Sequence, residues 1–336
     1  MNLFQSFNRK YIFHPAQALV IFIFFSLFRI LPIKISSAIG GWIGNIFGPS
    51  LSVSHRATRN LTRVFPEKTS TEIQGIVRGM WNNLGRLAGE YPHLSEINVY
   101  DSKGCVEVIG EEIIDQMRDD NRPGVFFSAH IGNWEIVPLC GSQRGLPITR
   151  VYRAANNKFV EWLYRQGRAV VDGELIQKGP QGVRPLLSAL KDGQHLGILM
   201  DQKMNDGISV PFFGFEAMTA PAIVELALRF DCPIIPIHIE RLNGCNFRVI
   251  IEQPLEINLS GRKNDDVFGV ITQINQRIEK KYISSLCIKI PHVPGKLGEV
   301  SSLIGFHENN IINMEILSKK TDYLEFIFDI QIRDLK

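Results

Sequence analysis

Short β-rich runs alternate with helical runs through the middle of the chain, and this alternation constrains the fold more than any other feature of the sequence. The strand-like runs are VEVIG near Val106, GVFFSAH from Gly124, PITRVYRA, HLGILMD, CPIIPIHIE and FRVIIEQ. Between them, EWLYRQGRAVV and GVRPLLSALKDG are typical of helices, and the second closes on Lys191, Asp192 and Gly193 as a helix C-terminus should. Strands that alternate with helices predict the α/β class, as an αβα sandwich.

An uncharged apolar segment, PAQALVIFIFFSLF, covers residues 15–28, with Arg9 and Lys10 before it and Arg29 and Lys34 after it. A spanning helix needs about 20 predominantly apolar residues, so this helix either crosses a bilayer or lies in its interface. A secretory signal peptide has the same outline, but no clear small-x-small cleavage site ends the run. We therefore predict an uncleaved N-terminal membrane helix.

Charge is unevenly distributed. The net charge is only +3, yet residues 1–100 hold ten Lys and Arg against four Glu and no Asp. This small net charge does not indicate nucleic acid binding, whereas a basic N-terminal third suits an anionic membrane surface. Arg56, Arg59 and Arg63 recur at helical spacing. They form either a solvated face or a face that contacts lipid phosphates or an acidic carrier protein.

The five cysteines are far apart and never form a C-x-x-C pair, so they predict reduced, buried thiols and no zinc or redox site. They are Cys105, Cys140, Cys232, Cys245 and Cys287. The chain also lacks an H-E-x-x-H zinc motif and a G-x-S-x-G nucleophile elbow.

The strand GVFFSA ends on His130, at the start of the sequence H-I-G-N-W-E. Ligands bind at the carboxyl ends of strands in an α/β sheet, so His130 is expected to face substrate. Glu135 lies five residues later and can reach His130 only if the chain turns, which Gly132 permits. A histidine held by a carboxylate is a workable general base. By itself this H-x-x-x-x-E pattern is weak.

The order of the surrounding blocks makes the pattern specific. Behind the N-terminal apolar segment stand SAHIGNWE, RVYRAANN, the QGRAV helix around Arg168, GVRPLLSALKDG, MDQ and VPFFGFEAMTAPA. Over roughly residues 10–280 the chain thus resembles the late acyltransferases of lipid A biosynthesis, the lauroyl and myristoyl transferases within the glycerolipid acyltransferase group. The resemblance implies catalytic roles for His130, Glu135 and Arg168. A snorkelling surface arginine is the other interpretation of Arg168.

Several polar residues are candidates for substrate binding. Arg150 and Arg153 flank a strand end near Asn156 and Asn157 and form either a phosphate-binding cluster or an ordinary surface. Asp201 and Gln202 end the strand HLGILM, at the same sheet edge as His130; they either support the fold by hydrogen bonds or contact substrate.

The block PFFGF, with Phe213, is most simply a core or tunnel wall, and the resemblance implies that it lines an acyl pocket together with Thr219.

The reaction implied is direct acyl transfer without a covalent intermediate. His130, oriented by Glu135, removes the proton of a lipid A precursor hydroxyl as it attacks an acyl carrier protein thioester, while arginines and backbone N–H groups stabilise the oxyanion. No metal or cofactor is required. The expected location is the cytoplasmic face of a bacterial inner membrane. The alternatives are acylation of a glycerolipid (lysophospholipid) and an inactive membrane-anchored sensor.

From about Ser285 the chain departs from that family. The remaining sequence predicts strand, helix, strand, strand, with PGKLGEV opening the helix, and resembles a partial ACT domain that lacks its last helix and strand. It is either a dimerising regulatory appendage or a remnant of gene fusion. The expected domains are a membrane anchor (1–35), an acyltransferase domain (36–283) and this βαββ segment (284–336).

Overall fold

The computed structural model describes residues 13–284, 288–291, 310–319 and 323–331. The chain divides into two compact units, Met1–Ile274 and Asn275–Lys336, and each is described by itself.

The first unit is built on a seven-stranded sheet with the strand order β1-β9-β8-β2-β5-β3-β4. Its strands are β1 (Val106–Ile109), β2 (Val125–Ser128), β3 (Ile148–Tyr152), β4 (Leu175–Gln177), β5 (His195–Leu199), β8 (Ile234–Asn243) and β9 (Asn246–Ile251). All neighbours run parallel except the β8–β9 hairpin. The six predicted strands are confirmed. The sequence analysis missed β4, which has only three residues.

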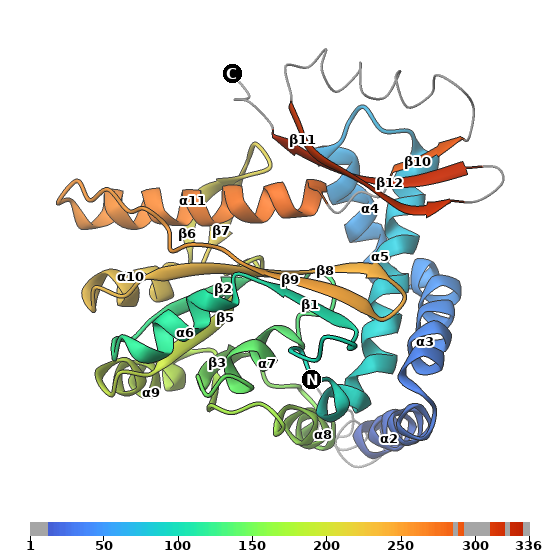
Figure 1. Cartoon of the computed structure of the whole chain (residues 1–336), viewed down its shortest axis with the longest axis horizontal. Coiled ribbons are helices and arrows are strands. Elements are labelled where there is room, and N and C mark those ends of the chain that lie inside the picture. The colour runs from blue at the N-terminus through green and yellow to red at the C-terminus, as the bar shows by residue number, and fades with distance from the viewer. Residues whose placement is uncertain (1–12, 285–287, 292–309, 320–322, 332–336) are drawn as a thin grey trace, which may run out of the picture. The chain divides into compact units, whose positions relative to one another are not determined.

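Helices cover the sheet on both faces. They are α2 (His14–Ile30), α3 (Ile33–Phe47), α4 (Ser52–Val64), α5 (Ser70–Glu90), α6 (Glu111–Asp119), α7 (Val137–Ser142), α8 (Lys158–Arg168), α9 (Pro180–Lys191), α10 (Ala222–Arg229) and α11 (Lys263–Ser284). Figure 1 shows α6 and α7 below the sheet and the part of α11 that belongs to the first unit, residues 263–274, above it. Ile113 and Ile114 of α6 pack with Ile235 and Val249 of the sheet in one buried cluster. This layering agrees with the predicted αβα sandwich.

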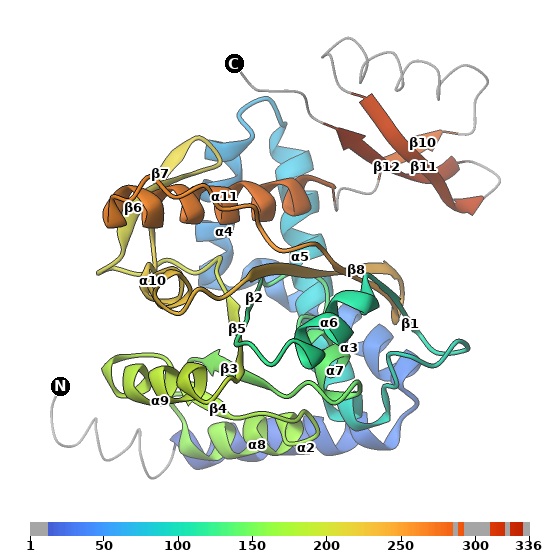
Figure 2. The ribbon, with the colours of Figure 1, turned by 60° about the vertical axis from the view of Figure 1, so that its left-hand side comes forward.

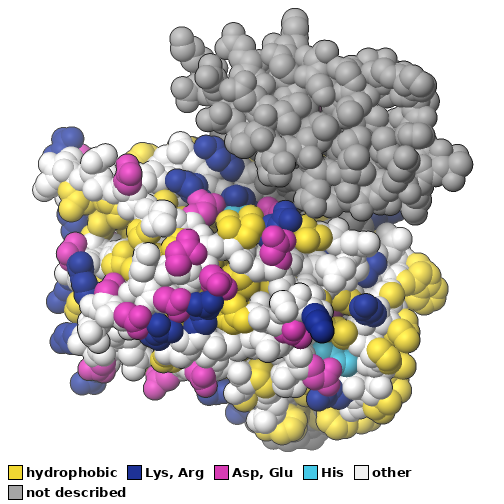
Figure 3. Space-filling view, in the orientation of Figure 1, with side chains coloured by type: hydrophobic (Ala, Val, Ile, Leu, Met, Phe, Trp, Pro, Cys, Tyr) yellow, Lys and Arg dark blue, Asp and Glu magenta, His cyan; other side chains and the backbone are white. Residues whose placement is uncertain are grey.

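The N-terminal apolar segment forms α2, a 17-residue helix that buries only Phe28. Within the described part of the chain, no helix combines the length and the apolar character that crossing a bilayer requires. The predicted membrane-spanning helix is therefore not supported. Figure 3 shows hydrophobic side chains gathered along the edge of the molecule where α2 and α3 lie. This outer apolar face consists of Leu19, Val20, Phe22, Ile23, Phe24, Leu27 and Ile30 of α2, and Ile35, Ile39, Trp42, Ile46 and Phe47 of α3.

A seam of glycines joins α3 to α5. A Cβ on Gly40 would lie 2.2 Å from the carbonyl oxygen of Gly85, and a Cβ on Gly44 would lie 2.1 Å from that of Trp81. The two backbones are therefore in direct contact, and only glycine fits at these positions. At its start α5 carries a capping box, in which Thr69 and Glu72 bind each other's backbone N–H.

Two smaller sheets complete the description. The strands β6 (Ile208–Phe212) and β7 (Phe215–Thr219) form an antiparallel hairpin in the first unit. In the second unit β10 (Ile288–Pro291), β11 (Asn310–Lys319) and β12 (Tyr323–Gln331) form an antiparallel sheet with β12 in the middle. The three predicted C-terminal strands are present. The helix predicted at PGKLGEV lies outside the described residues, so the ACT-like identity of this segment stays a prediction.

Candidate active site

Strand register brings His130 and Asp201 together. The strands β2 and β5 are parallel neighbours with Ser128 opposite Leu199. His130 lies two residues beyond Ser128, and Asp201 lies two residues beyond Leu199. Because parallel strands advance at the same rate, both residues emerge together at the carboxyl edge of the sheet. The predicted placement of His130 and Asp201 at one sheet edge is confirmed.

Asp201 holds His130 through both of its oxygens. Its Oδ1 lies 2.7 Å from His130 Nδ1, and its Oδ2 accepts the His130 backbone N–H at 2.8 Å. Gln202 Nε2 lies 3.3 Å from His130 Nε2. With Nδ1 donating to the carboxylate, Nε2 carries the lone pair that a general base requires, and this lone pair faces Gln202 Nε2. The imidazole is 29% exposed, so Nε2 remains accessible to a substrate.

Glu135 does not contact His130 as predicted but binds Arg168. Arg168 Nε donates to Glu135 Oε2 at 2.9 Å, and Arg168 Nη2 donates to Oε1 at 2.5 Å, a bidentate pair. Both ring nitrogens of His130 have other partners. The prediction of a His130–Glu135 pair was wrong because it assumed the nearest carboxylate in sequence, whereas parallel pairing supplies one 71 residues away.

The loop from His130 to Glu135, here called the His130 loop, turns at Gly132. Gly132 has φ +56°, and a Cβ there would lie 2.7 Å from the carbonyl oxygen of Ile239. Both conditions favour glycine, in agreement with the predicted turn. Trp134 packs its ring against the imidazole of His130 edge to face, with the centroids 4.8 Å apart.

Arg150 and Arg168, both predicted as site residues, have different hydrogen-bond partners. Burial would lower the pKa of Arg168, but the hydrogen bonds and the charge of Glu135 outweigh it and raise that pKa. Burial and the nearby charge of Arg168 lower the pKa of Arg150 to about 10. Arg150 Nη2 donates to the carbonyl oxygen of Val171 at 2.9 Å. Arg150 thus ties β3 to the chain that follows α8, and this contact is a structural one.

A cavity of about 210 Å³ opens beside His130. Its polar lining comprises Ser128, His130, Glu135, Arg150, Tyr152, Arg153, Arg168, Lys178 and Gln202. Its apolar lining comprises Phe126, Phe127, Trp134, Val137, Pro138, Ile148, Val151, Leu175, Ile198, Leu199 and Ile237. The cavity thus combines an apolar wall with a few convergent polar groups, the usual composition of a ligand site. Lys178, Tyr152 and Trp134 were not predicted, because no motif marks them.

Four predicted substrate residues lie outside this lining: Asp201, which binds His130, and three that do not reach it. Asn156 is exposed, while its neighbour Asn157 is buried and caps α8 by accepting the Phe159 N–H. Phe213 is at the turn of the β6–β7 hairpin, where its ring contacts that of Phe65 at 6.1 Å. Thr219 is buried at the end of β7 and donates to the carbonyl oxygen of Ala217. The structure does not bring these three side chains to His130.

A buried polar network beneath the His130 loop was not predicted at all. Glu90, at the end of α5, is fully buried and binds Arg241 of β8 through both carboxylate oxygens. Ser37 Oγ donates to Glu90 Oε1 at 2.6 Å, and Asn133 Nδ2 donates to Oε2 at 2.8 Å. We call this set, with Asn83, the Glu90 network.

The network holds the loop at two consecutive residues. Asn133 is fully buried and binds Glu90 directly. Asn83 donates to the carbonyl oxygen of Gly132 at 2.8 Å and accepts from Arg241 Nε at 2.8 Å. Each buried polar group therefore has a partner, as burial requires. In the sequence, Asn83, Arg86 and Glu90 recur at helical spacing on one face of α5, but nothing marks that face as buried.

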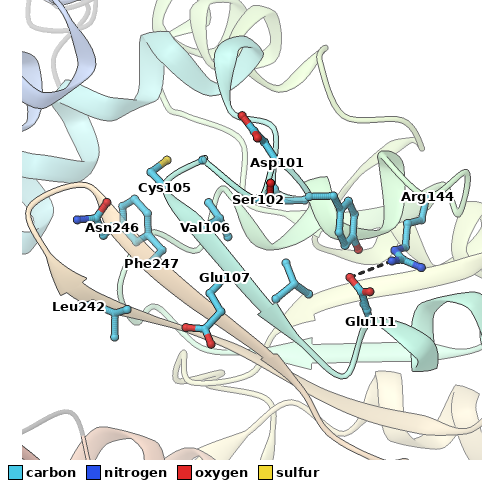
Figure 4. Close-up of a pocket in the computed structure, with 14 residues that line it drawn as sticks. Asp101, Ser102, Cys105, Val106, Glu107, Glu111, Arg144, Leu242, Asn246 and Phe247 are labelled. Atoms are coloured by element: carbon cyan, nitrogen blue, oxygen red, sulfur yellow. Dashed lines mark ion pairs between the residues drawn. The ribbon is translucent and has the colours of Figure 1, made fainter. Parts of the chain in front are cut away.

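A second cavity, of about 510 Å³, lies along the edge strand β1 (Figure 4). Arg144 pairs there with Glu111 at 2.9 Å and stacks over the ring of Tyr100. This pair closes within the wall, and the cavity holds none of the predicted site residues.

Thiols and metal ligands contribute nothing at the His130 cavity. Within the described residues, no group of three or more His, Cys, Asp and Glu side chains is arranged to hold a metal ion. Cys140, Cys232 and Cys245 are buried and unpaired, as predicted, and Cys105 is half-buried. Burial raises the pKa of Cys140 to about 12 and that of Cys232 to about 11, so neither is a reactive thiolate near neutral pH. The fifth cysteine lies outside the described residues.

Comparison with known proteins gives one consistent result. A family model described as bacterial lipid A biosynthesis acyltransferase matches residues 7–284. Lipid A biosynthesis acyltransferase 2 of Shigella flexneri is 23% identical over 253 residues, which is 72% of this chain and 76% of the relative. Lipid A biosynthesis acyltransferase of Haemophilus influenzae is 24% identical over 251 residues, 73% and 75% of the two chains. Lipid A biosynthesis myristoyltransferase of Escherichia coli is 24% identical over 188 residues, 55% and 58%.

Proposed function

The chain belongs to the bacterial lipid A biosynthesis acyltransferase family, and from that premise we propose that it transfers a fatty acyl group from an acyl carrier protein thioester to a hydroxyl of a lipid A precursor. The observation that carries the proposal is the His130–Asp201 pair at the mouth of a cavity with an apolar wall. This pair supplies a base, and the wall suits an acyl chain.

The proposed chemistry uses His130 twice. Nε2 takes the proton of the acceptor hydroxyl as that oxygen attacks the thioester carbonyl carbon. The tetrahedral intermediate then collapses, the C–S bond breaks, and the imidazolium returns the proton to the departing thiolate. Asp201, at 2.7 Å from Nδ1, fixes the tautomer and stabilises the transient imidazolium.

Cationic side chains are better placed than the backbone to stabilise negative charge in this cavity. The N–H groups of His130 and Ile131 already donate to Asp201 and to the carbonyl oxygen of Ala129. Arg153 and Lys178 line the cavity and are exposed. We assign to them the oxyanion or the acceptor's phosphates, with Arg168 held at the cavity wall by Glu135.

Two surfaces fit the expected partners. The outer apolar face of α2 and α3 suits the interface of the inner membrane at its cytoplasmic side, parallel to the bilayer plane. Arg56, Arg59 and Arg63 of α4 are all exposed and offer a basic surface to an acidic carrier protein.

The test compares three variants in a transfer assay with purified lipid A precursor and acyl carrier protein thioester. His130→Ala removes the base and should lower kcat by about 10²–10⁴-fold. Asp201→Asn removes the partner of Nδ1 and should lower kcat more than Glu135→Gln does, with KM changed little. A parallel assay with a lysophospholipid acceptor separates the two acceptor classes.

Full activity of His130→Ala would end the proposal. A larger loss in Glu135→Gln than in Asp201→Asn would mean that Glu135 orients the histidine during the reaction, as the sequence predicts.

A further inference from the structure

The outward side of α8 exposes two aromatic rings. Phe159 and Trp162 are each 57% exposed, while Val160 and Leu163 of the same helix are buried. Residues three apart are neighbours on a helix surface, so the two rings form one patch. Single exposed apolar residues are common in soluble proteins, but adjoining aromatic rings beside a larger apolar face indicate a binding surface.

The helix α8 lies directly beside α2. Asn157, which caps α8, donates from Nδ2 to the carbonyl oxygen of His14 at 2.8 Å and to Gln17 Oε1 at 3.1 Å. Figures 1 and 2 both show the two helices side by side. The helix that carries the aromatic patch therefore lies beside α2, which carries part of the outer apolar face.

Charge on α8 selects the kind of partner. Lys158 and Arg165 are exposed, one helical turn before and one turn after Trp162. Aromatic rings flanked by long cationic side chains match the interface of an anionic bilayer, where the rings enter the headgroup region and the cations contact phosphates.

The other end of α8 belongs to the His130 cavity. Arg168, the last residue of the helix, binds Glu135 and lines the cavity with it. A helix that contacts lipid through Phe159 and Trp162 would thus hold the cavity within one helix length of the bilayer, about 16 Å for 11 residues.

We propose that α8 is a second membrane-docking element, which inserts Phe159 and Trp162 into the interface of an anionic phospholipid bilayer next to α2. The proposal deepens the proposed function, since it rests on a lipid acceptor that reaches the cavity from the membrane. It also assigns to the bilayer, and not to a second copy of the chain, the surface that α8 exposes.

The first experiment places an environment-sensitive dye on α8. Trp162→Cys in the full chain is labelled with a nitrobenzoxadiazole maleimide and mixed with vesicles of phosphatidylethanolamine and phosphatidylglycerol. The matched control is Val183→Cys on α9, 47% exposed in the native protein, and the unmutated chain gives the labelling blank. We expect a severalfold rise and a blue shift of the dye emission at position 162 and none at position 183.

The second experiment measures the contribution to binding. Phe159→Ser/Trp162→Ser should weaken vesicle binding in a sedimentation assay by about tenfold or more, whereas Val183→Ser/Leu259→Ser should change it less than about twofold. The double variant should also raise KM for acceptor in vesicles and leave kcat unchanged.

Three outcomes would overturn the proposal. A chain that binds vesicles while the dye at position 162 stays in water would dock through α2 alone. A blue shift that appears without vesicles and rises with protein concentration would make the patch an interface between copies. Equal binding to phosphatidylcholine vesicles would contradict the role of Lys158 and Arg165. The labelled Trp162→Cys chain should show the same blue shift with and without His130→Ala, because docking needs no turnover. Loss of acyl transfer in the His130→Ala chain is thereby distinguished from loss of membrane docking.

Discussion

Beneath the His130 loop the protein buries charged and amide side chains, whereas over α2, α3 and α8 it exposes large apolar ones. Glu90 and Asn133 have no exposed surface, yet Ile30 is 80% exposed and Trp42 62%. Burial of an unpaired polar group is costly, so the Glu90 network is stable only because its members bind one another. The large apolar side chains of α2, α3 and α8 remain exposed among the described residues, and contiguous exposed apolar surface is typical of a binding face.

The helix α3 takes part in both regions. The helix α3 contributes Ser37 to the Glu90 network and Trp42 and Ile46 to the outer apolar face, and α5 contributes Asn83 and Glu90. One layer of helix therefore separates the outer apolar face from the contacts that hold the His130 loop. The comparison suggests that the interior network fixes catalytic geometry and the exterior face fixes location, and that substitutions can separate the two.

The largest expected effect comes from breaking the network. Glu90→Ala leaves Arg241 buried without its partner, so the free energy of unfolding should fall by about 3–5 kcal/mol. Trp42→Ser on the outer face should change it by no more than about 0.5 kcal/mol and weaken only vesicle binding. Urea unfolding followed by circular dichroism, in one detergent for all variants, measures the free energy of unfolding of each variant. Sedimentation with vesicles measures their binding.

A double variant then tests what the network is for. Glu90→Met/Arg241→Met removes the unpaired Arg241 charge and should recover part of the lost stability, while Ser37 and Asn133 still lack their acceptor. The kcat of this double variant should be lower than that of the unmutated protein, because Asn133 lacks its acceptor and the His130 loop loses one of its two anchoring hydrogen bonds. Recovery of kcat together with stability would reduce the network to a fold-stabilising role.

The next effect concerns the seam between the two regions. Gly85→Ala puts a Cβ 2.1 Å from the carbonyl oxygen of Gly40, so α3 must move away from α5, at a cost of about 1–3 kcal/mol. In the same helix a Cβ on Gly79 meets nothing within 4 Å, and Gly79→Ala should stabilise the protein by up to about 1 kcal/mol. Thermal unfolding of the pair gives the comparison. Equal shifts of the same sign would show that α3 and α5 are not in backbone contact.

The sequence predicts the strands and the position of His130 well, but not the side-chain pairs that join distant parts of the chain. Alternating strand and helix patterns identified six of the seven strands of the large sheet, though not the β6–β7 hairpin, and the carboxyl end of β2 located His130, because both follow from local periodicity. The partner of His130 depends on strand order. Because β5 lies next to β2, Asp201 binds His130, and Glu135 pairs with Arg168 instead. The pattern of H-x-x-x-x-E carries no information on that order. The Glu90 network joins α3, α5 and β8, and no local signal predicts contacts over 151 residues of separation.

The smallest expected effect tests the rule that buried polar groups need partners. His195, at the start of β5, is buried, and its Nε2 has no hydrogen-bond partner among the described residues. Burial lowers its pKa from the usual 6.5, more than the charge of Asp120 raises it. The folded protein therefore binds fewer protons than the unfolded chain, and this contribution to stability is present above about pH 6.5 and is lost as the pH falls toward the lower folded pKa.

Stability measured by urea unfolding should thus decline as the pH falls below about 6.5. His195→Phe, beside Phe126 at a ring distance of 6.0 Å, should flatten that decline, because phenylalanine binds no proton in either state. His55→Phe on the exposed side of α4 is the matched control and should leave the slope unchanged. An unaltered slope in His195→Phe would mean that this histidine is protonated in the fold. A buried polar group without a partner would then be tolerated here, and pairing in the Glu90 network would no longer explain why its charges can be buried.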